Sequence, residues 1–250
     1  MFSLNDKRAL VTGGASGIGE GIAELLVASG AQVAIADVDA TKGEVAVEHL
    51  GAGKATFVHM DLTEADSVAR GVSEAESAIG PLDILVNCAG ADVIKPFRDT
   101  DEELWEWLVQ LNLLGVLRTC RAVLPGMTER KSGRIINIAS DAARVGSSGE
   151  AVYSACKGGV LSFTKSLARE LARDGVTVNA VCPGPTDTPA TQKTLAEGGE
   201  GIIRALTRAI PLGRLAVPAD VAGTVVFLAG EQSSFITGQT LSVSGGLSMI

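Results

Sequence analysis

Short apolar runs alternate with longer amphipathic stretches along almost the whole chain. The runs are short enough for buried strands, and the stretches between them repeat apolar residues at helical spacing. The pattern predicts seven strands, at 8–12, 32–37, 55–61, 82–87, 133–139, 176–181 and 240–243. It predicts helices after the first strand, where Ile18, Ile22, Leu25 and Leu26 recur, and at 40–50, 64–79, 101–124, from just after Gly149 to about 173, and 218–229.

Strands that alternate with helices of this length are typical of a parallel sheet with helices on both faces. The chain has 250 residues, which suits one sizeable domain, and no linker, repeat or low-complexity tract divides it. We therefore expect a single α/β domain over residues 1–250. Its fold would be a doubly wound, seven-stranded parallel sheet of the Rossmann type.

A glycine-rich turn, TGGASGIG, follows the first predicted strand and precedes the first helix. Glycine lets a backbone approach a ligand closely, and the N-terminus of a helix attracts an anion. The second strand ends in Asp37, eighteen residues after Gly19. An acid at this place hydrogen-bonds a ribose diol and repels a 2′-phosphate. The combination predicts a dinucleotide site that favours NAD.

Other polar residues also stand at the ends of apolar runs. Thr12, Asp61 and Asn87 each stand at the end of a predicted strand, as Asp37 does. Ligands of open parallel sheets bind beyond the carboxyl ends of the strands. These four residues should therefore meet at one edge of the sheet, where the glycine turn lies.

Composition narrows the class of protein. The net charge is −8, which argues against nucleic-acid binding, and no apolar run approaches the length of a membrane span. The four cysteines are scattered without a CxxC pair, and no signal segment opens the sequence, so we expect a cytoplasmic chain with reduced thiols. The two histidines, His49 and His59, have neither metal-ligand spacing nor a nucleophile beside them. We therefore expect neither a bound metal nor Ser-His-Asp chemistry.

Tyr153 is the only tyrosine, and Lys157 follows it at helical spacing. A cation beside a phenol lowers the phenol pKa, and Ser140 at the end of the fifth strand could donate to a substrate oxygen. On these residues alone, a surface Tyr–Lys pair on an amphipathic helix is the simpler interpretation. Asn112 interrupts a leucine-rich helix, either buried with partners or facing solvent.

Residues 189–210 have a weak pattern with Gly198 and Gly199 inside it. A weakly patterned segment at the ligand edge is a candidate flexible substrate lid. After the last strand an apolar tail runs to Ile250, and we expect it to pack, with a subunit contact as one place for it.

From Thr12 to Gly246 the sequence resembles the short-chain dehydrogenase/reductase family. The resemblance rests on Thr12-Gly13-x₃-Gly17-x-Gly19, on Asn87-Cys88-Ala89-Gly90, on Pro183-Gly184-x₃-Thr188 and on the set Asn112, Ser140, Tyr153 and Lys157. Cys88 departs from the asparagine of the family motif, and Thr186 departs from a usually aliphatic position.

The resemblance implies roles for these residues. Tyr153 would be the general acid/base, Ser140 would hold the substrate oxygen, Lys157 would bind the nicotinamide ribose and lower the Tyr153 pKa, and Asn112 would position a water. The implied cofactor is NAD, in contact with Gly13, Ser16, Gly17, Ile18, Gly19, Asp37, Asp61, Leu62, Asn87, Ala89, Gly90, Tyr153, Lys157, Pro183, Gly184, Thr186 and Thr188.

The implied activity is hydride transfer between NAD and a secondary alcohol or ketone. Three stretches, SDAARVGSSGEAVYSACKGG, VCPGPTDT and ITGQTLSVSGGLSM, are similar to 2-hydroxycyclohexanecarboxyl-CoA dehydrogenases, so a small alcohol or ketone or an acyl-CoA is the expected substrate. An NADPH-dependent 3-oxoacyl-carrier-protein reductase and a non-catalytic NAD sensor remain alternatives. Family members are commonly homotetramers, with 101–124 and 151–173 in a main interface. Asp141 and Arg144 could contact a polar substrate or be surface charges.

Overall fold

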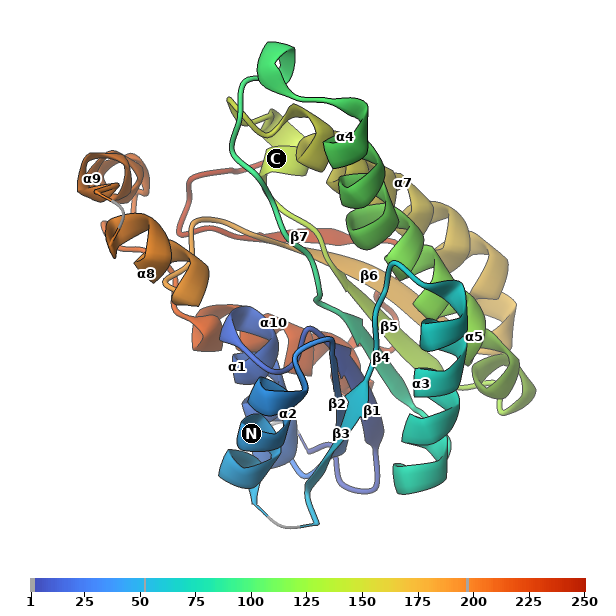
Figure 1. Ribbon diagram of the computed structural model, residues 1–250. Coiled ribbons are helices and arrows are strands. Elements are labelled where there is room, and N and C mark those ends of the chain that lie inside the picture. Colours follow the sequence, from blue (N-terminus) through green and yellow to red (C-terminus); the bar gives the residue numbers. More distant parts are fainter. Residues whose placement is uncertain (1–2, 52, 197) are drawn as a thin grey trace.

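The computed structural model describes residues 3–51, 53–196 and 198–250. Its centre is one sheet of seven parallel strands in the order β3-β2-β1-β4-β5-β6-β7, as the sequence predicts (Figure 1). The strands are β1 (Arg8–Thr12), β2 (Gln32–Asp37), β3 (Ala55–His59), β4 (Ile84–Asn87), β5 (Gly133–Ile138), β6 (Val176–Pro183) and β7 (Thr240–Val243).

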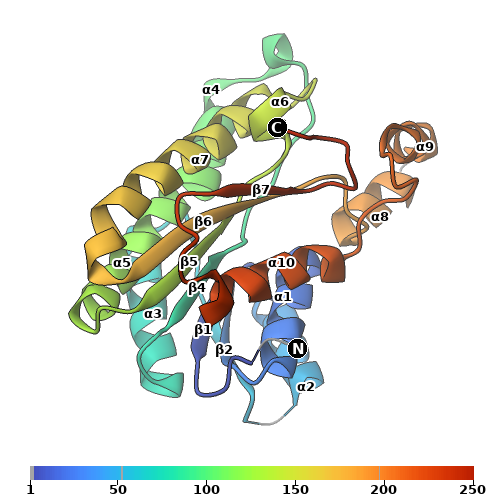
Figure 2. The ribbon, with the colours of Figure 1, turned by 180° about the vertical axis from the view of Figure 1, so that it is seen from behind.

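Helices cover both faces of the sheet (Figures 1 and 2). On one face α1 (Gly17–Ala28), α2 (Ala40–Leu50) and α10 (Pro218–Ala229) share a core with the sheet. On the other face the core includes α3 (Ala65–Ile79), α5 (Gly115–Glu129) and α7 (Ala151–Leu171). Neighbouring residues of a strand point to opposite faces, so Leu10 belongs to the second core and Val11 to the first.

The register of the strands aligns their polar ends. Thr12 pairs with Asn87 across β1 and β4, and Asn87 pairs with Asn137 across β4 and β5. β1 and β4 run side by side although they are far apart in sequence, so the chain reverses its direction of winding between them. The carboxyl edge of the sheet at this crossover is where an open α/β sheet binds its ligands.

The helix expected at 101–124 is longer and less regular than predicted. It consists of α4 (Glu102–Val109), a π-helical segment (Gln110–Leu114) and α5, which continues to Glu129 with Pro125 inside it. Its length and its mean hydropathy of 1.2 would by themselves allow a membrane span. In this structure α5 packs on α3, β4 and β5, which gives its apolar residues partners within the protein.

The segment 189–210 is more regular than expected. It forms α8 (Pro189–Ala196) and α9 (Glu200–Ala209), which stand apart from the sheet in Figures 1 and 2. The sequence also did not predict the short helix α6 (Ala142–Val145) or the 3-10 turns at Phe97–Asp99, Ala172–Asp174 and Glu231–Ser233. In the tail, Ser248 is buried and bonded to Ser244, whereas Met249 and Ile250 are 80% and 66% exposed, so the packing of the last two residues stays a prediction.

Candidate active site

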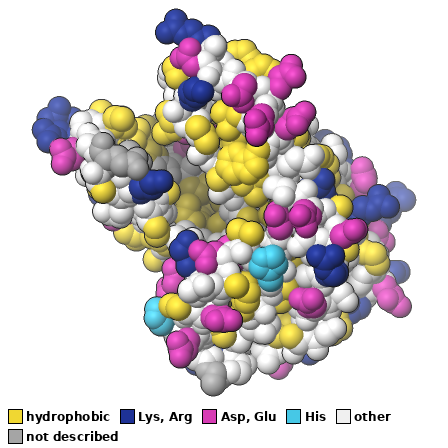
Figure 3. Space-filling view, in the orientation of Figure 1, with side chains coloured by type: hydrophobic (Ala, Val, Ile, Leu, Met, Phe, Trp, Pro, Cys, Tyr) yellow, Lys and Arg dark blue, Asp and Glu magenta, His cyan; other side chains and the backbone are white. Residues whose placement is uncertain are grey.

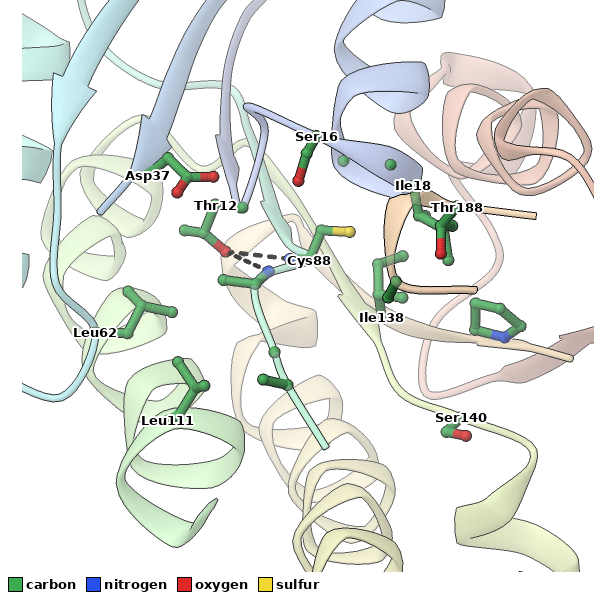
Figure 4. A pocket seen from close by; sticks show the side chains of 18 of the residues that line it. Thr12, Ser16, Ile18, Asp37, Leu62, Cys88, Leu111, Ile138, Ser140 and Thr188 are labelled. Carbon is green, nitrogen blue, oxygen red and sulfur yellow. Dashed lines mark hydrogen bonds between the residues drawn. The ribbon is translucent and has the colours of Figure 1, made fainter. Parts of the chain in front are cut away.

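A cleft of about 700 Å³ lies at the carboxyl ends of the strands. Figure 3 shows it as the hollow at the centre of the molecule, and Figure 4 shows its lining from close by. Of the residues that the resemblance assigned to cofactor or catalysis, all line this cleft except Asn87 and Asn112. The structure thus brings together residues from both halves of the chain.

The glycine turn forms one wall of the cleft, and its geometry requires glycine. Gly13 and Gly17 have φ values of +65° and +57°, which other residues adopt rarely. A Cβ on Gly13 would lie 2.7 Å from Cα of Ala89, and one on Gly19 would collide with the carbonyl of Gly13. The Ser16 side chain does not cap α1, so the first-turn amides of α1 remain available to an anion.

Asp37 lies at the end of β2, beside the glycine turn (Figure 4). Its carboxylate accepts hydrogen bonds from the backbone N–H of Ala15 at 3.3 Å and of Asp39 at 3.1 Å, which fix its direction. Asp61, after β3, accepts from both the N–H and the hydroxyl of Thr63. Both carboxylates are held at the same end of the cleft, next to Leu62.

Thr12 and Asn87 join β1 to β4 behind the cleft. The Thr12 hydroxyl accepts hydrogen bonds from the N–H groups of Cys88 and Ala89 (Figure 4). Asn87 is 1% exposed, and its amide donates to Asn137 at 2.9 Å and accepts from the Thr119 hydroxyl at 2.6 Å. Its side chain therefore ties β4 to β5 and α5 and does not line the cleft.

Asn112 is fully buried in the π-helical segment, so the solvent-facing alternative is wrong. Its side-chain NH₂ donates to the carbonyls of Ala91 at 2.9 Å and of Leu108 at 3.1 Å, and its Oδ1 accepts from the N–H of Ala91. A widened helical turn leaves backbone groups for a side chain to satisfy, and Asn112 satisfies one of them. It ties the loop after β4 to this helix.

Ser140, Tyr153 and Lys157 converge at the other end of the cleft. Ser140 follows β5, and its hydroxyl faces Tyr153 closely enough to lower the pKa of the phenol. Lys157 is 2% exposed, donates to the carbonyl of Ile138 at 2.9 Å and lies 5.7 Å from the centroid of the Tyr153 ring. A surface Tyr–Lys pair is therefore excluded.

The pKa of Tyr153 is shifted in the direction opposite to the one expected from the sequence. Burial raises the pKa of Tyr153 above its ordinary value, and the Asp92 and Glu150 carboxyls raise it further, against the Ser140 hydroxyl, which lowers it. We expected Lys157 to lower this pKa, but burial outweighs any such effect. Burial also lowers the pKa of Lys157 itself.

The last wall of the cleft comes from the end of β6 and the start of α8. The hydroxyl of Thr191 donates to the carbonyl of Thr186 at 2.7 Å and lies 3.3 Å from the hydroxyl of Thr188. The Thr186 hydroxyl in turn donates to the carbonyl of Gly184. The base of the expected lid is thus held to the cleft by hydroxyl contacts.

Sequence reasoning assigned no role at the cleft to several residues that line it, namely Val38, Met60, Ala91, Trp107, Leu111, Ile138, Glu150 and Thr191. Most are apolar residues that continue a strand end or helix stripe, and their pattern gives no sign of exposure to a ligand. Glu150 could have been found, because it is an acid immediately before the helix that carries Tyr153.

Asp141 and Arg144 do not line the cleft. The Arg144 guanidinium donates a hydrogen bond to the Ser242 hydroxyl, which in turn donates to the Asp141 carboxylate at 2.5 Å.

Sequence comparison identifies relatives over the whole chain. A family model described as enoyl-(acyl carrier protein) reductase matches residues 13–248. The 3-oxoacyl-(acyl-carrier-protein) reductase FabG of Vibrio cholerae is 39% identical over the full length of both chains, and that of Vibrio harveyi is 41% identical. The oxidoreductase UcpA of Salmonella typhimurium is 37% identical over 98% of this chain and 96% of its own.

Structure comparison agrees with this result. A solved structure titled "Crystal structure of gox2181" superposes with a TM-score of 0.94 and 35% identity, over 98% of this chain and 96% of that one. The single-domain parallel sheet, the glycine turn and the full-length relatives all lead to one assignment. The chain is an oxidoreductase that belongs to the short-chain dehydrogenase/reductase family, which uses nicotinamide cofactors.

Proposed function

We propose that the protein interconverts a secondary alcohol and a ketone by reversible hydride transfer, with Tyr153 as the general acid/base. The observation that carries this proposal is the convergence of Ser140, Tyr153 and Lys157 on the cleft that the glycine turn and Asp37 also line. A non-catalytic NAD sensor would need only the glycine turn and Asp37, and not the three converging side chains.

The residues divide the chemistry between them. In alcohol oxidation the Tyr153 oxygen takes the hydroxyl proton, and Ser140 holds the substrate oxygen with a hydrogen bond. Lys157 is placed to donate to the nicotinamide ribose with the protons that Ile138 does not occupy. The cofactor, when bound, accepts the hydride from the carbon that bears the hydroxyl. In reduction the same proton and hydride return to the ketone.

NAD is the cofactor that the charges favour. The carboxylate of Asp37 suits the two hydroxyls of a ribose and repels a 2′-phosphate. Among the described residues that line the cleft, Lys157 is the only cation, and it lies at the catalytic end. A 2′-phosphate beside Asp37 would therefore find no lysine or arginine from the cleft wall.

For the substrate, we place 3-oxoacyl and 3-hydroxyacyl thioesters first, on carrier protein or coenzyme A. The support is the printed function of the FabG relatives, which are named 3-oxoacyl-(acyl-carrier-protein) reductases. This reverses the order that the sequence suggested, in which a cyclic 2-hydroxyacyl-CoA came first. A FabG-type reductase that uses NADPH remains the second candidate, favoured by the same relatives and opposed by Asp37.

Two further expectations stay proposals. We propose a homotetramer in which α4, α5 and α7 form a main interface, and a cytoplasmic location. Support for the interface comes from the exposed apolar residues near the start of α4, where Phe97 is 55% exposed. Sedimentation of the purified protein would test the tetramer directly.

One experiment separates the candidate functions. NADH and NADPH oxidation is followed with 3-oxoacyl thioesters and cyclic 2-oxoacyl thioesters, in wild type and in Tyr153→Phe. We expect NADH oxidation with a 3-oxoacyl thioester, and at least a 10³-fold loss in Tyr153→Phe. Cofactor binding, followed by calorimetry, should persist in the variant. Substantial remaining turnover would overturn the role of Tyr153, and a preference for NADPH would overturn the Asp37 argument.

A further inference from the structure

The chain has two tryptophans, and both lie on α4 with different surroundings. The Trp105 indole N–H donates to the Thr100 hydroxyl at 2.7 Å, and its ring stacks on Phe97 with the centroids 5.2 Å apart. Trp107 is 40% exposed and lines the cleft. Trp105 therefore has packing partners within the chain, whereas Trp107 presents a large apolar surface to a cavity.

The position of Trp107 in the cleft follows from its neighbours. In Figure 4, Leu62 and Leu111 lie close together below Asp37, and Ser140 lies at the opposite end. Trp107 precedes Leu111 by four residues, which places the two on the same side of their helix. Trp107 thus extends the apolar wall that Leu62 and Leu111 form at the Asp37 end.

That end of the cleft is suited to a flat aromatic ligand. Met60 is 2% exposed and Leu62 4% exposed, so the wall is packed from behind. If Asp37 holds the adenosine ribose, as proposed above, the attached base must lie within one ring's length of it, against these apolar side chains. Aromatic side chains at nucleotide sites stack on a base through its π-face, because every base has one.

We propose that Trp107 forms the outer wall of the adenine site and contacts the purine ring of the cofactor. The inference rests on the proposed NAD site but adds a residue that the chain's motifs do not indicate. Trp107 acts here as a binding residue for the adenine half and has no part in the hydride step. Ligands that carry adenine should therefore report on it, and ligands that carry only the nicotinamide half should not.

Tryptophan fluorescence tests this directly, with no need for turnover. AMP, ADP-ribose and nicotinamide mononucleotide are titrated into wild type, Trp105→Phe and Trp107→Phe. We expect AMP and ADP-ribose to change the emission of wild type and of Trp105→Phe saturably, and nicotinamide mononucleotide to leave it unchanged. The response should disappear in Trp107→Phe, whose remaining indole is Trp105. Comparison of wild type with Trp107→Phe suffices even if Trp105→Phe folds poorly.

Binding affinity gives an independent measurement. By calorimetry, Trp107→Ala should weaken ADP-ribose binding roughly 10-fold, and Trp107→Phe, which keeps a ring, should weaken it less than about 3-fold. Trp105→Phe should bind as wild type does. Circular dichroism confirms that each variant is folded.

The outcomes separate this inference from the proposed function. If ADP-ribose binds but the Trp107 emission does not respond and Trp107→Ala binds normally, the Trp107 inference is overturned and the NAD site stands. A response to nicotinamide mononucleotide instead of AMP would also overturn it, because Trp107 would then lie at the nicotinamide half. If neither NAD nor ADP-ribose binds the folded wild type, both proposals fall.

Discussion

Asp92 and Glu150 line the same recess next to Tyr153, and the Glu150 carboxyl raises the pKa of Asp92. Two neighbouring carboxyls repel each other when both are ionised, which favours the protonated form of one of them. Oδ2 of Asp92 is buried and has no hydrogen-bond partner among the described residues. Burial, and then Glu150, raise the pKa of Asp92 to about 7. The charge of this pair therefore changes near neutral pH, beside the proposed general base.

The first prediction concerns stability. Because the folded-state pKa of Asp92 lies above its ordinary value, the folded protein binds more protons than the unfolded chain between about pH 4 and pH 7. Stability should fall as pH rises through this window and stay lower above it. Asp92→Asn should remove the loss and raise the free energy of unfolding by about 1 kcal/mol at about pH 8, with little effect at about pH 4.5.

Urea unfolding at the two pH values measures this effect. Asp99→Asn is the matched control, because Asp99 is exposed and close in sequence. An equal gain at both pH values would show that the variant acts through packing and not through proton binding.

The second prediction concerns the pH profile of catalysis. The Glu150 and Asp92 carboxyls raise the pKa of Tyr153, so removing one negative charge should lower it. In Glu150→Gln, the rise of kcat with pH in alcohol oxidation should move toward lower pH by about 0.5 to 1 unit. Steady-state rates between about pH 6 and pH 10 measure the shift. A profile that keeps its midpoint while only its height changes would count against electrostatic control of Tyr153.

The third prediction concerns cofactor choice. Asp37 is already oriented by the N–H groups of Ala15 and Asp39, so its carboxylate is directed before any ligand binds. Asp37→Ala should weaken NAD binding roughly 10- to 100-fold, the value of hydrogen bonds to a charged group, and should weaken NADP binding less. Calorimetry with both cofactors measures the ratio.

The control for this variant is Asp39→Ala. Asp39 caps α2 through the N–H of Lys42 and does not line the cleft. It should lower stability slightly without changing the ratio of the two affinities. If Asp37→Ala kept the NAD preference of wild type, another residue would have to be the source of the discrimination.

The strands and most helices could be predicted from the sequence because the apolar pattern within each segment is enough to indicate them. The buried strands read as unbroken apolar runs, and β1, β2, β7, α2 and α10 have the predicted bounds. Strand ends were less predictable: β3 ends at His59 and not at 61, because whether a polar residue continues a ladder depends on its neighbour across the sheet.

Features that depend on contacts between distant segments were not predictable. The π-helical segment around Asn112 depends on the loop of Ala91, which its side chain satisfies. The recess that Asp92 and Glu150 share brings together the loop after β4 and the start of α7, and each acid alone has the pattern of a solvent-exposed loop residue. In the same way, the cleft position of Trp107 follows from tertiary structure, because its sequence pattern is that of a core stripe.

The last prediction concerns Asn112, whose amide forms hydrogen bonds with backbone groups of Leu108 and Ala91. Replacing it with alanine would leave the carbonyl of Leu108 and both backbone groups of Ala91 without these bonds, in a fully buried place. Each unsatisfied buried group costs about 1–3 kcal/mol, and relaxation recovers part of it, so Asn112→Ala should lose about 2–4 kcal/mol of unfolding free energy. The exposed amide of Asn5 offers a control, since Asn5→Ala should change stability by less than about 0.5 kcal/mol.

Because Asn112 also holds the loop beside Gly90, folded Asn112→Ala should bind ADP-ribose more weakly than wild type, which calorimetry measures. A variant as stable as wild type would mean that the π-helical segment relaxes to a regular helix without Asn112, and that its amide serves the reaction alone.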